Sequence, residues 1–458
     1  MTDTIINQLK GKKILILGFG REGVSTYRFI RKYFPDTELV AADRSEALNT
    51  EEFKDDKHIT FITGASYSQH LNDYDLIFKT PGVNLNRINY YVQRNRIVSQ
   101  TELFLQAFGR QTIGVTGTKG KSTTSSLIYH LLSKSRGNAF LAGNIGIPFF
   151  DIIDKLDEQS VVVAELSAHQ LEYTECSPHI AILLNMYQEH LDHFQSLSDY
   201  QLAKMNITKY QNENDVLIYN VEDDHIPKLI TSHAYQRKSY KFSCSHSVDK
   251  GCYCHEDAIV RVENGEIKGE YDLSQHDNLP GRHNYNNIMA AILAVKEYGI
   301  SDEDIIRHLS GFTGLEHRIE YVGCFRGIKF YNDSISTIPE AAIAALNALK
   351  KVDTLIIGGF DRGISYDMLI EHLHQHPVTN VVFIGPAGQR IKREWEQKYE
   401  LPVSVLEEND FERIAEFCFQ NTAEGRVCLM SPAAASYDQF ENFEERGRKF
   451  KTCILQHK

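Results

Sequence analysis

The chain has 458 residues, which at about 150 residues per domain predicts three domains, each large enough to bury its own core. Hydrophobic residues make up 42% and charged residues 24%, which excludes a disordered or fibrous chain. The formal net charge of -12 argues against general nucleic-acid binding, because phosphate backbones repel an acidic surface.

The first residues carry no apolar signal segment, and no apolar stretch reaches the ~18 residues that span a bilayer. We therefore expect a cytoplasmic protein without membrane insertion. Eight cysteines are too few for a disulfide framework, so reduced thiols are expected. One cluster has zinc-ligand chemistry, but its C-x-C spacing favours surface thiols over a zinc site. Its members are Cys244, His246, Cys252, Cys254 and His255.

Apolar runs alternate with helical patterns from the N-terminus onward. Residues 13–17 and 39–42 are expected strands on either side of a helix that runs to residue 33, which is a βαβ unit. Strands expected at 76–78 and 96–99 complete a small parallel sheet.

A second region begins with a strand at 112–115, a glycine-rich loop at 117–121 and a helix at 122–134. Further strands are expected at 161–164, 180–184 and 216–219. A polar, turn-rich stretch follows at 232–277, and then a long helix after Gly281.

The glycines of GFTG (311–314) indicate a linker to a third region. Its expected strands are 329–332, 354–357, 381–384 and 427–429, with helices such as 338–350. The chain is thus predicted to be α/β with three domains. These are an N-terminal Rossmann-like domain (1–99), a central P-loop mononucleotide-binding parallel sheet (100–313) and a C-terminal Rossmann-like α/β domain (314–458).

The first chemical motif is Gly18-x-Gly20-x-x-Gly23, which follows a strand, with Asp43 ending the next strand. Such glycines let backbone amides approach a diphosphate, and the carboxylate accepts hydrogen bonds from a ribose or a base. Taken alone, the motif leaves an NAD enzyme, another nucleotide ligand and a structural turn open.

The second motif, TGTKGKST (116–123), indicates binding of ATP or GTP. Amides around Gly120 cradle phosphate oxygens, Lys121 neutralises their charge, and the Ser122 hydroxyl suits Mg²⁺. The loop is a variant, because Val115 stands where the strict pattern has glycine.

Carboxylate and imidazole groups follow at Glu165, His190, Asp192 and His193, and Lys204 is expected near the start of a helix. Glu165 ends a strand that reads as buried, where an unpaired carboxylate is costly, so Mg²⁺ is an attractive partner.

Together these residues resemble the ATP-dependent Mur ligase family over the whole chain. The signatures are GVTGTKGKST (114–123), AGNIG (142–146), AELSAHQLE (164–172), EHLDHF (189–194), GRHNYNN (281–287), LEHRIE (315–320) and NDS (332–334).

The resemblance implies how the ATP and metal sites are built. ATP would contact Gly117, Thr118, Lys119, Gly120, Lys121, Ser122, Thr123, Asn284, Asn287, Arg318 and Asp333. Ser122 and Glu165 would hold one Mg²⁺, and His190 and Lys204 a second, with Lys204 carbamylated by CO₂. Lys121, His190, Lys204 and Glu165 would be the catalytic residues.

The resemblance also implies that the N-terminal domain holds the UDP part of a UDP-sugar and performs no hydride chemistry. The nucleotide would lie against Arg21, Glu22, Asp43, Arg44, Thr80, Pro81 and Gly82. Asn144, Ser167 and Gln170 would line the sugar-peptide arm.

Within the family, the segment 431–450 (SPAAASYDQFENFEERGRKF) is similar to the members that add D-glutamate to UDP-N-acetylmuramoyl-L-alanine through an acyl phosphate. D-Glutamate would be held by Thr337, Arg362, Ser436 and Phe443. The chain departs from the family pattern at Ile335 and Arg362, where lysine is usual, and at Tyr437, where leucine is usual.

Several alternatives stay open. Another Mur ligase or a folylpolyglutamate-type ligase would use a different acceptor, although the latter needs no N-terminal UDP domain. An NAD-dependent oxidoreductase or a non-enzymatic nucleotide switch would have no use for the segment 431–450. A monomer is expected.

Overall fold

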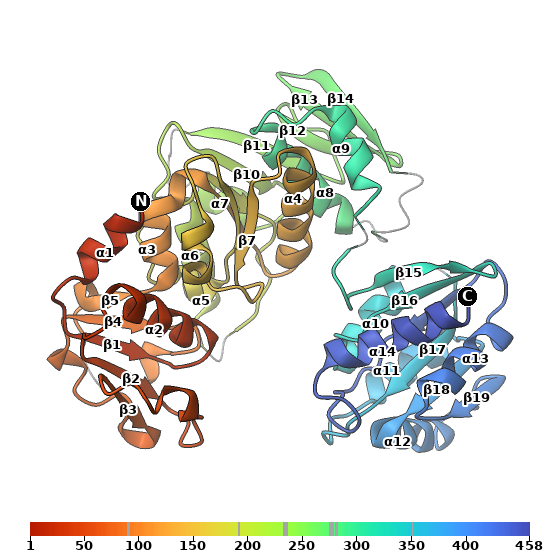
Figure 1. Ribbon diagram of the computed structural model, residues 1–458. Helices are drawn as coiled ribbons and strands as arrows, with labels where there is room; N and C mark the ends of the chain where they lie inside the picture. Colours follow the sequence, from red (N-terminus) through yellow and green to blue (C-terminus); the bar gives the residue numbers. More distant parts are fainter. Residues whose placement is uncertain are drawn as a thin grey trace. The chain divides into compact units, whose positions relative to one another are not determined.

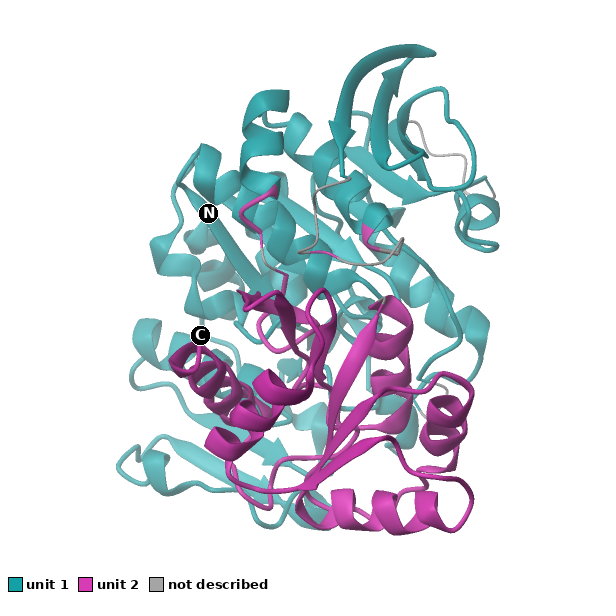
Figure 2. Ribbon diagram, turned by 90° about the vertical axis from the view of Figure 1, so that its right-hand side faces the viewer, with its two compact units in different colours: residues 1–274, 285–309 teal, residues 275–284, 310–458 magenta. Residues whose placement is uncertain are grey.

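The computed structural model describes residues 1–88, 92–190, 193–231, 237–273, 279, 283–312, 314–349 and 351–458. These residues form two compact units, shown in Figure 2, which comprise 1–274 with 285–309, and 275–284 with 310–458. Helices alternate with strands along the chain, and the strands of each sheet are mostly parallel. This confirms the predicted α/β class (Figure 1).

In the first unit, the N-terminal sheet is parallel and has the strand order β3-β2-β1-β4-β5. The strands are β1 (Ile14–Leu17), β2 (Leu39–Asp43), β3 (Ile59–Thr63), β4 (Leu76–Lys79) and β5 (Ile97–Val98), and the helices are α1 (Thr2–Leu9), α2 (Arg21–Tyr33) and α3 (Gln100–Phe108). All side chains of β1 are buried, as a central parallel strand requires.

The central sheet of the same unit has the order β14-β13-β12-β11-β10-β9-β6-β8-β7 and is parallel from β7 to β12. The strands are β6 (Thr112–Thr116), β7 (Ala139–Gly143), β8 (Val161–Glu165), β9 (Ile180–Leu183), β10 (Val216–Asn220), β11 (Lys238–Ser243), β12 (Gly251–His255), β13 (Ala258–Glu263) and β14 (Glu266–Asp272). The helices are α4 (Lys121–Ser135), α5 (Ala168–Leu171), α6 (Leu197–Lys209), α7 (Ile226–Thr231), α8 (His283–Lys296) and α9 (Asp302–Leu309).

The two sheets of this unit share one apolar core. Phe149 stacks on Phe104 of α3 with ring centroids 4.5 Å apart, and Phe150 packs on Phe29 of α2 at 4.3 Å. The hydroxyl of Ser25 donates to Asp151 at 2.6 Å beside them. This packing fixes the loops of the N-terminal sheet relative to those of the central sheet.

Two sequence expectations about the central region were wrong. The polar stretch 232–277 contains β11 to β14, which are partly exposed. β11 pairs parallel with β10 and β12, whereas β13 pairs antiparallel with β12 and β14. Lys204 lies in the middle of α6, because this helix begins seven residues earlier at Leu197. Gly281, Asp192, residue 313 of the expected linker and Lys350 of the expected helix lie outside the described residues.

The second unit contains a sheet in the order β15-β16-β20-β17-β18-β19, parallel except between β15 and β16. The strands are β15 (Glu320–Phe325), β16 (Ile328–Asn332), β17 (Val352–Gly358), β18 (Asn380–Ile384), β19 (Ser404–Glu407) and β20 (Val427–Met430). The helices are α10 (Pro339–Ala348), α11 (Asp367–Gln375), α12 (Gly385–Glu396), α13 (Phe411–Asn421) and α14 (Phe443–Gln456).

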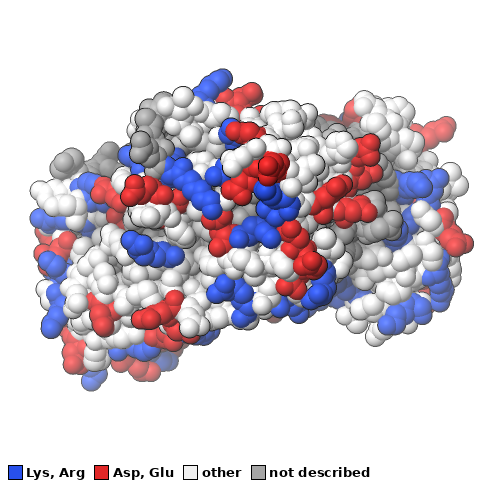
Figure 3. All heavy atoms as spheres, turned by 90° about the horizontal axis from the view of Figure 1, so that it is seen from above, with Lys and Arg blue, Asp and Glu red and all other residues white. Residues whose placement is uncertain are grey.

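The described surface is mixed in charge. On the face drawn in Figure 3, Lys and Arg side chains are interspersed with Asp and Glu, so neither sign forms a continuous field there. In the described part of the chain, no helix combines the length and apolar character needed to span a bilayer.

Candidate active site

A cavity of about 590 Å³ opens at the carboxyl end of the N-terminal sheet. Every residue predicted to hold the UDP part lines it: Arg21, Glu22, Asp43, Arg44, Thr80, Pro81 and Gly82. Gly18 has a φ of +92°, and a Cβ there would come within 2.0 Å of Thr80 Oγ1, so glycine is required for the two loops to touch. The first residues of α2 also line the cavity, where the N-terminus of a helix favours an anion.

Asp43 holds two loops of this cavity together. Its Oδ2 accepts a hydrogen bond from the backbone amide of Phe19 at 2.7 Å, and its Oδ1 accepts one from the amide of Ser45 at 2.8 Å. The carboxylate therefore shapes the wall of the cavity as well as carrying charge there.

Further residues of this wall were not predicted as substrate ligands. His169 and His193 line the cavity, and His193 Nε2 lies 3.0 Å from Glu172 Oε2, which also receives Lys79 Nζ at 3.3 Å. Lys79 is buried at the end of β4. A lysine that ends an otherwise apolar strand, directly before Thr80, was the signal in the sequence.

Glu22 belongs to the same charged group. Burial raises the pKa of its carboxyl to about 7, although a hydrogen bond with Gln170 and the charge of Lys79 act in the opposite direction. Gln170 in turn forms a capping box with Ser167 at the start of α5. Two of the predicted arm residues are thus joined through Glu22 to the cavity that the predicted UDP residues line.

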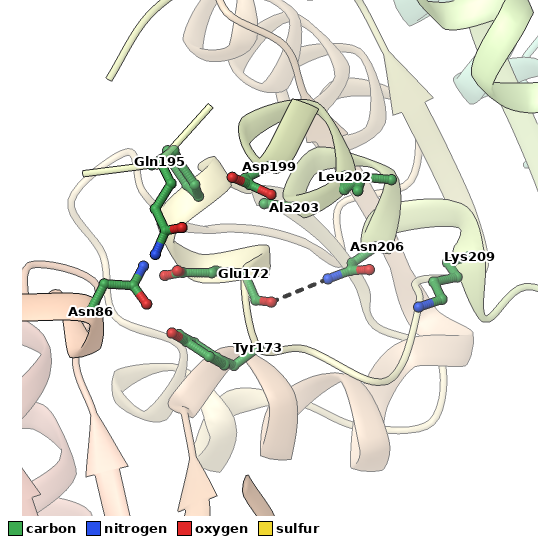
Figure 4. A pocket seen from close by; sticks show the side chains of 10 residues that line it. Asn86, Glu172, Tyr173, Gln195, Asp199, Leu202, Ala203, Asn206 and Lys209 are labelled. Carbon is green, nitrogen blue, oxygen red and sulfur yellow. Dashed lines mark hydrogen bonds between the residues drawn. The ribbon is translucent and has the colours of Figure 1, made fainter. Parts of the chain in front are cut away.

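A second cavity, of about 390 Å³, lies between the loop that follows α5 and helix α6. Figure 4 shows the amides of Asn86 and Gln195 facing each other across it, and Asn206 donating a hydrogen bond to the Glu172 carbonyl. Glu172 lines this second cavity and contacts His193, which lines the first. No residue of the predicted site lines this second cavity.

The predicted phosphate-binding loop connects β6 to α4. Gly120 has a φ of +84°, and a Cβ there would come within 2.5 Å of Asn287 Oδ1 on α8. Asn287 Oδ1 also accepts a hydrogen bond from Thr124 at 3.1 Å, so α8 supports the loop. Lys121 Nζ donates to the carbonyl oxygens of Gly117 at 2.9 Å and Thr118 at 3.1 Å. Ser122 and Thr123 stand in the first turn of α4, and Asn284 in the first turn of α8.

Lys119 links this loop to residues that follow β9. Its amide donates to Asn185 Oδ1 at 2.8 Å, and its Nζ pairs with Glu189 at the same distance. The side chain of Lys119 is thus engaged by a neighbouring carboxylate at the mouth of the loop.

Glu165 ends β8 beside the loop and is almost fully buried. Its Oε1 accepts a hydrogen bond from Asn144 Nδ2 at 2.8 Å, whereas its buried Oε2 has no hydrogen-bond partner among the described residues. A buried carboxylate oxygen without a donor is costly, and a cation would remove that cost. The predicted metal ligand and arm residue are therefore in direct contact.

Lys204 reaches the same loop from α6. Its Nζ donates to the carbonyl oxygen of Gly117 at 2.9 Å and lies 4.6 Å from the centre of the Tyr200 ring. Burial, together with the nearby charge of Lys121, lowers the pKa of Lys204 to about 7. A large fraction of this amine is therefore neutral near neutral pH.

His190 has a φ of +59° and a partly exposed ring. Its ring centroid lies 4.7 Å from that of His169 and 6.1 Å from that of Tyr200, so His190 and Lys204 both border Tyr200. Across the described residues, no three His, Cys, Asp or Glu side chains are arranged to hold a metal ion. The cysteine and histidine cluster is accordingly not assembled as a zinc site.

In the second unit, the predicted nucleotide residue Asp333 directly follows β16 and is buried. Its Oδ1 accepts a hydrogen bond from the Ile319 amide at 3.1 Å, and its Oδ2 accepts one from Ser431 at 2.7 Å. Burial raises the pKa of Asp333 to about 6. Arg318, the other predicted contact in this unit, adjoins Ile319 before β15.

Two of the predicted D-glutamate residues, Ser436 and Phe443, lie next to the partners of Arg446, a buried arginine that the sequence analysis missed. Arg446 donates from Nε to the Ser334 hydroxyl at 3.0 Å, and from its other nitrogens to carbonyl oxygens of Ser334, Ala434 and Ala435. Ser436 follows these residues, and the carbonyl oxygen of Phe443 accepts from the Ser334 hydroxyl at 2.8 Å.

Arg362, which stands where the family has lysine, donates a hydrogen bond to the carbonyl oxygen of Thr337. Two predicted ligands of D-glutamate are thereby in contact. Tyr437, the other departure, is exposed, and its ring centroid lies 6.3 Å from that of exposed Phe360.

Comparison with known proteins adds to this geometry. Residues 115–295 match the model of the Mur ligase middle domain. The UDP-N-acetylmuramoylalanine–D-glutamate ligase of Acetivibrio thermocellus is 33% identical over 458 residues, covering 98% of this chain and 97% of the relative. The ligase of the same name from Ruminiclostridium cellulolyticum is also 33% identical, covering 97% of both chains.

Solved structures agree on the fold. The Thermotoga maritima MurF ligase in complex with ADP matches with a TM-score of 0.55 at 17% identity, covering 97% of this chain and 95% of that one. The UDP-N-acetylmuramate-alanine ligase MurC from Thermotoga maritima matches with a TM-score of 0.56 at 20% identity, covering 98% and 100%. Because the similarity to the curated relatives extends over nearly the whole of both sequences, the chain belongs to the Mur ligase family.

Proposed function

We propose that the protein joins D-glutamate to UDP-N-acetylmuramoyl-L-alanine in an ATP-dependent amide ligation. The observation that carries the proposal is that one compact unit holds both the cavity lined by the predicted UDP residues and the glycine-rich loop between β6 and α4. The relatives named for this reaction match over the whole chain. A nicotinamide cofactor at Gly18 to Gly23 is no longer needed to explain the first motif.

Activation of the substrate carboxylate is the first step of the proposed reaction. A carboxylate oxygen of the alanyl group attacks the γ-phosphorus of ATP, so a new P–O bond forms while the bond to the bridging oxygen breaks and ADP leaves. Lys121 would exchange its loop carbonyls for phosphate oxygens and neutralise their charge. The product of this step is an acyl phosphate.

The residues present suit Mg²⁺ at this loop. The buried Oε2 of Glu165 without a hydrogen-bond donor and the Ser122 hydroxyl would hold one ion, and His190 with modified Lys204 a second. When bound, such ions neutralise the charge of the transferring phosphoryl group.

We propose that Lys204 is carbamylated. The neutral amine is the form that adds to CO₂, and burial makes that form available near neutral pH. The nitrogen bonds to the carbon of CO₂ and releases one proton, so an anionic oxygen ligand would stand where a protonated amine would repel bound metal ions.

Capture by the amine is the second step. The deprotonated amine of D-glutamate attacks the acyl carbon, and phosphate leaves from the tetrahedral intermediate. His190 would stabilise the oxyanion, and its partly exposed ring is accessible to a bound substrate. Arg362, Thr337, Ser436 and Phe443 would hold D-glutamate. We further propose a cytoplasmic enzyme that acts as a monomer.

Phosphate release from ATP tests this function. The purified protein with UDP-N-acetylmuramoyl-L-alanine should release phosphate when D-glutamate is added, and mass spectrometry should detect the new amide. L-Glutamate, L-alanine, L-lysine and meso-diaminopimelate should be inactive. Turnover with one of these instead would indicate another acceptor, and no ATP consumption with any of them would refute the ligase proposal.

A further inference from the structure

Two thiols meet where the ladder between β11 and β12 ends. The last register pair is Ser243 with Tyr253, so the next step along these parallel strands brings Cys244 beside Cys254. Neighbours in register on parallel strands point to the same face of a sheet. Their Sγ atoms lie 2.9 Å apart, and both side chains are partly exposed.

We propose that Cys244 and Cys254 form a thiol modification site that closes to an intramolecular disulfide by exchange with a small disulfide such as oxidised glutathione. One protein thiolate attacks a sulfur of the oxidant and releases one small thiol. The second protein thiolate then attacks the resulting mixed disulfide and releases the other. Two protein thiols are oxidised, one small disulfide is reduced to two thiols, and both protons go to the released thiols.

The other cysteines lack this combination of contact and access. Cys252 is buried on β12, and Cys418, Cys428 and Cys453 are buried in the second unit. Burial raises the pKa of Cys176 to about 12, which withholds its reactive thiolate. Cys324 is exposed, but it lies on β15 of the second unit, whereas the pair belongs to the first unit.

The thiol pair is connected to the phosphate-binding loop through α8. Cys244 Sγ lies 3.4 Å from Asn286 Oδ1, to which the thiol donates. The next residue, Asn287, accepts a hydrogen bond from Thr124 and closely approaches Gly120. Oxidation removes the thiol proton shared with Asn286 and therefore acts on the helix end that supports the loop.

A second connection runs through the residues beside Cys244. The Ser243 hydroxyl donates to Glu222 Oε1 at 2.9 Å, and the Ser245 amide donates to the same oxygen. Asp223, the next residue, accepts the Met186 amide at 2.7 Å. Met186 follows Asn185, and the Asn185 side chain accepts a hydrogen bond from the backbone amide of Lys119 in the loop.

This coupling rests on the proposed nucleotide site, whereas formation of the disulfide does not. Coupling between two sites is reciprocal, so if oxidation weakens ATP binding by a given factor, bound ATP must disfavour oxidation by the same factor. We expect about a fivefold effect, the lower end of such couplings.

The full-length protein is equilibrated with mixtures of reduced and oxidised glutathione, with and without ATP. Intact mass and alkylation of the remaining thiols should show loss of two hydrogens confined to the Cys244–Cys254 peptide pair. The variants C244S and C254S should lose this product, and C324S should keep it. ATP affinity, measured by calorimetry, should fall about fivefold on oxidation of wild type and of C324S but not of C254S.

The possible failures separate the claims. Retention of both thiols at every glutathione ratio, or a glutathione adduct that never resolves to the internal disulfide, would overturn the modification site. A disulfide with unchanged ATP affinity would overturn the coupling. If the protein forms the disulfide on oxidation but binds no ATP in its reduced state, the proposed nucleotide site is refuted and the thiol proposal stands.

Discussion

Lys204 Nζ donates a hydrogen bond to the carbonyl oxygen of Gly117 at 2.9 Å, which ties a buried lysine of α6 to the start of the phosphate-binding loop. A cation in this position faces Lys121 of the same loop, and that repulsion adds to burial in lowering its pKa. The amine is thus held beside the loop in a form that is easily deprotonated.

Replacement of Lys204 by Ala should nearly abolish ligation, because the proposed carbamate could no longer form. Bicarbonate with a short acid such as acetate should restore part of the activity by filling the ligand position. Initial rates with and without acetate measure this, and circular dichroism controls for folding. Wild-type activity of K204A would remove Lys204 from the site.

Gly120 provides a test of the loop itself. Replacement by Ala places a Cβ 2.5 Å from Asn287 Oδ1 at a φ of +84°, so kcat/KM for ATP should fall on the order of 100-fold. Gly137 is the matched control, because its φ is +82° but a Cβ there would meet nothing within 4 Å. G137A should lose only about 1 kcal/mol of stability. Equal kinetic losses in the two variants would mean that crowding at Asn287 is irrelevant.

The loops of the candidate site were predictable because their signals are local. Gly18 and Gly120 both adopt the positive φ that such loops need, and the spacing of glycines along the chain reveals this directly. The ends of β1, β4 and β6 followed from short apolar runs. The UDP residues that the family resemblance implied line one cavity beside these loops.

The remaining features depend on tertiary packing. Lys79, His169 and His193 meet only when α5 packs beside the N-terminal sheet, and no spacing in the sequence encodes that contact. β13 was overlooked because a polar average over 232–277 hides its alternation AIVRVE. The charged sequence of α14 suggests that Arg446 lies on the surface. In the structure it is buried, and it donates hydrogen bonds to backbone carbonyl oxygens of the loop after β20.

Because the pKa of Glu22 is raised on folding, we expect the free energy of unfolding to depend on pH. Its pKa is raised from 4.5 to about 7 in the folded protein, so between these values the folded state binds more protons than the unfolded state. Stability from this group is therefore fully present below pH 4.5 and is lost as the pH rises through 7, by on the order of 3 kcal/mol. Urea unfolding of wild type and E22Q from pH 5 to 8 should show a smaller decline in the variant. Parallel pH profiles would contradict this.

If Glu165 is a metal ligand, its replacement should change the Mg²⁺ requirement of the reaction specifically. Glu165→Gln keeps an oxygen for Asn144 but removes the charge at the buried position that lacks a hydrogen-bond donor, so folding should be retained. The Mg²⁺ concentration for half-maximal activity should rise about 10- to 100-fold. Glu189→Gln is the control, because that carboxylate is more exposed and pairs with Lys119. An unchanged Mg²⁺ requirement in E165Q would exclude Glu165 as a ligand.

Substitution of Arg446 tests the proposed D-glutamate site of the second unit. Arg446→Lys keeps the positive charge but loses the planar fork that joins Ser334 to the carbonyl oxygens of Ala434 and Ala435. These acceptors would be left buried without donors, so unfolding free energy should fall by about 3 kcal/mol and the KM for D-glutamate should rise more than that for ATP. Arg448→Lys, on the exposed side of α14, should change neither quantity. Equal KM changes for both substrates in R446K would show that the arginine supports the unit as a whole rather than the loops around Ser436.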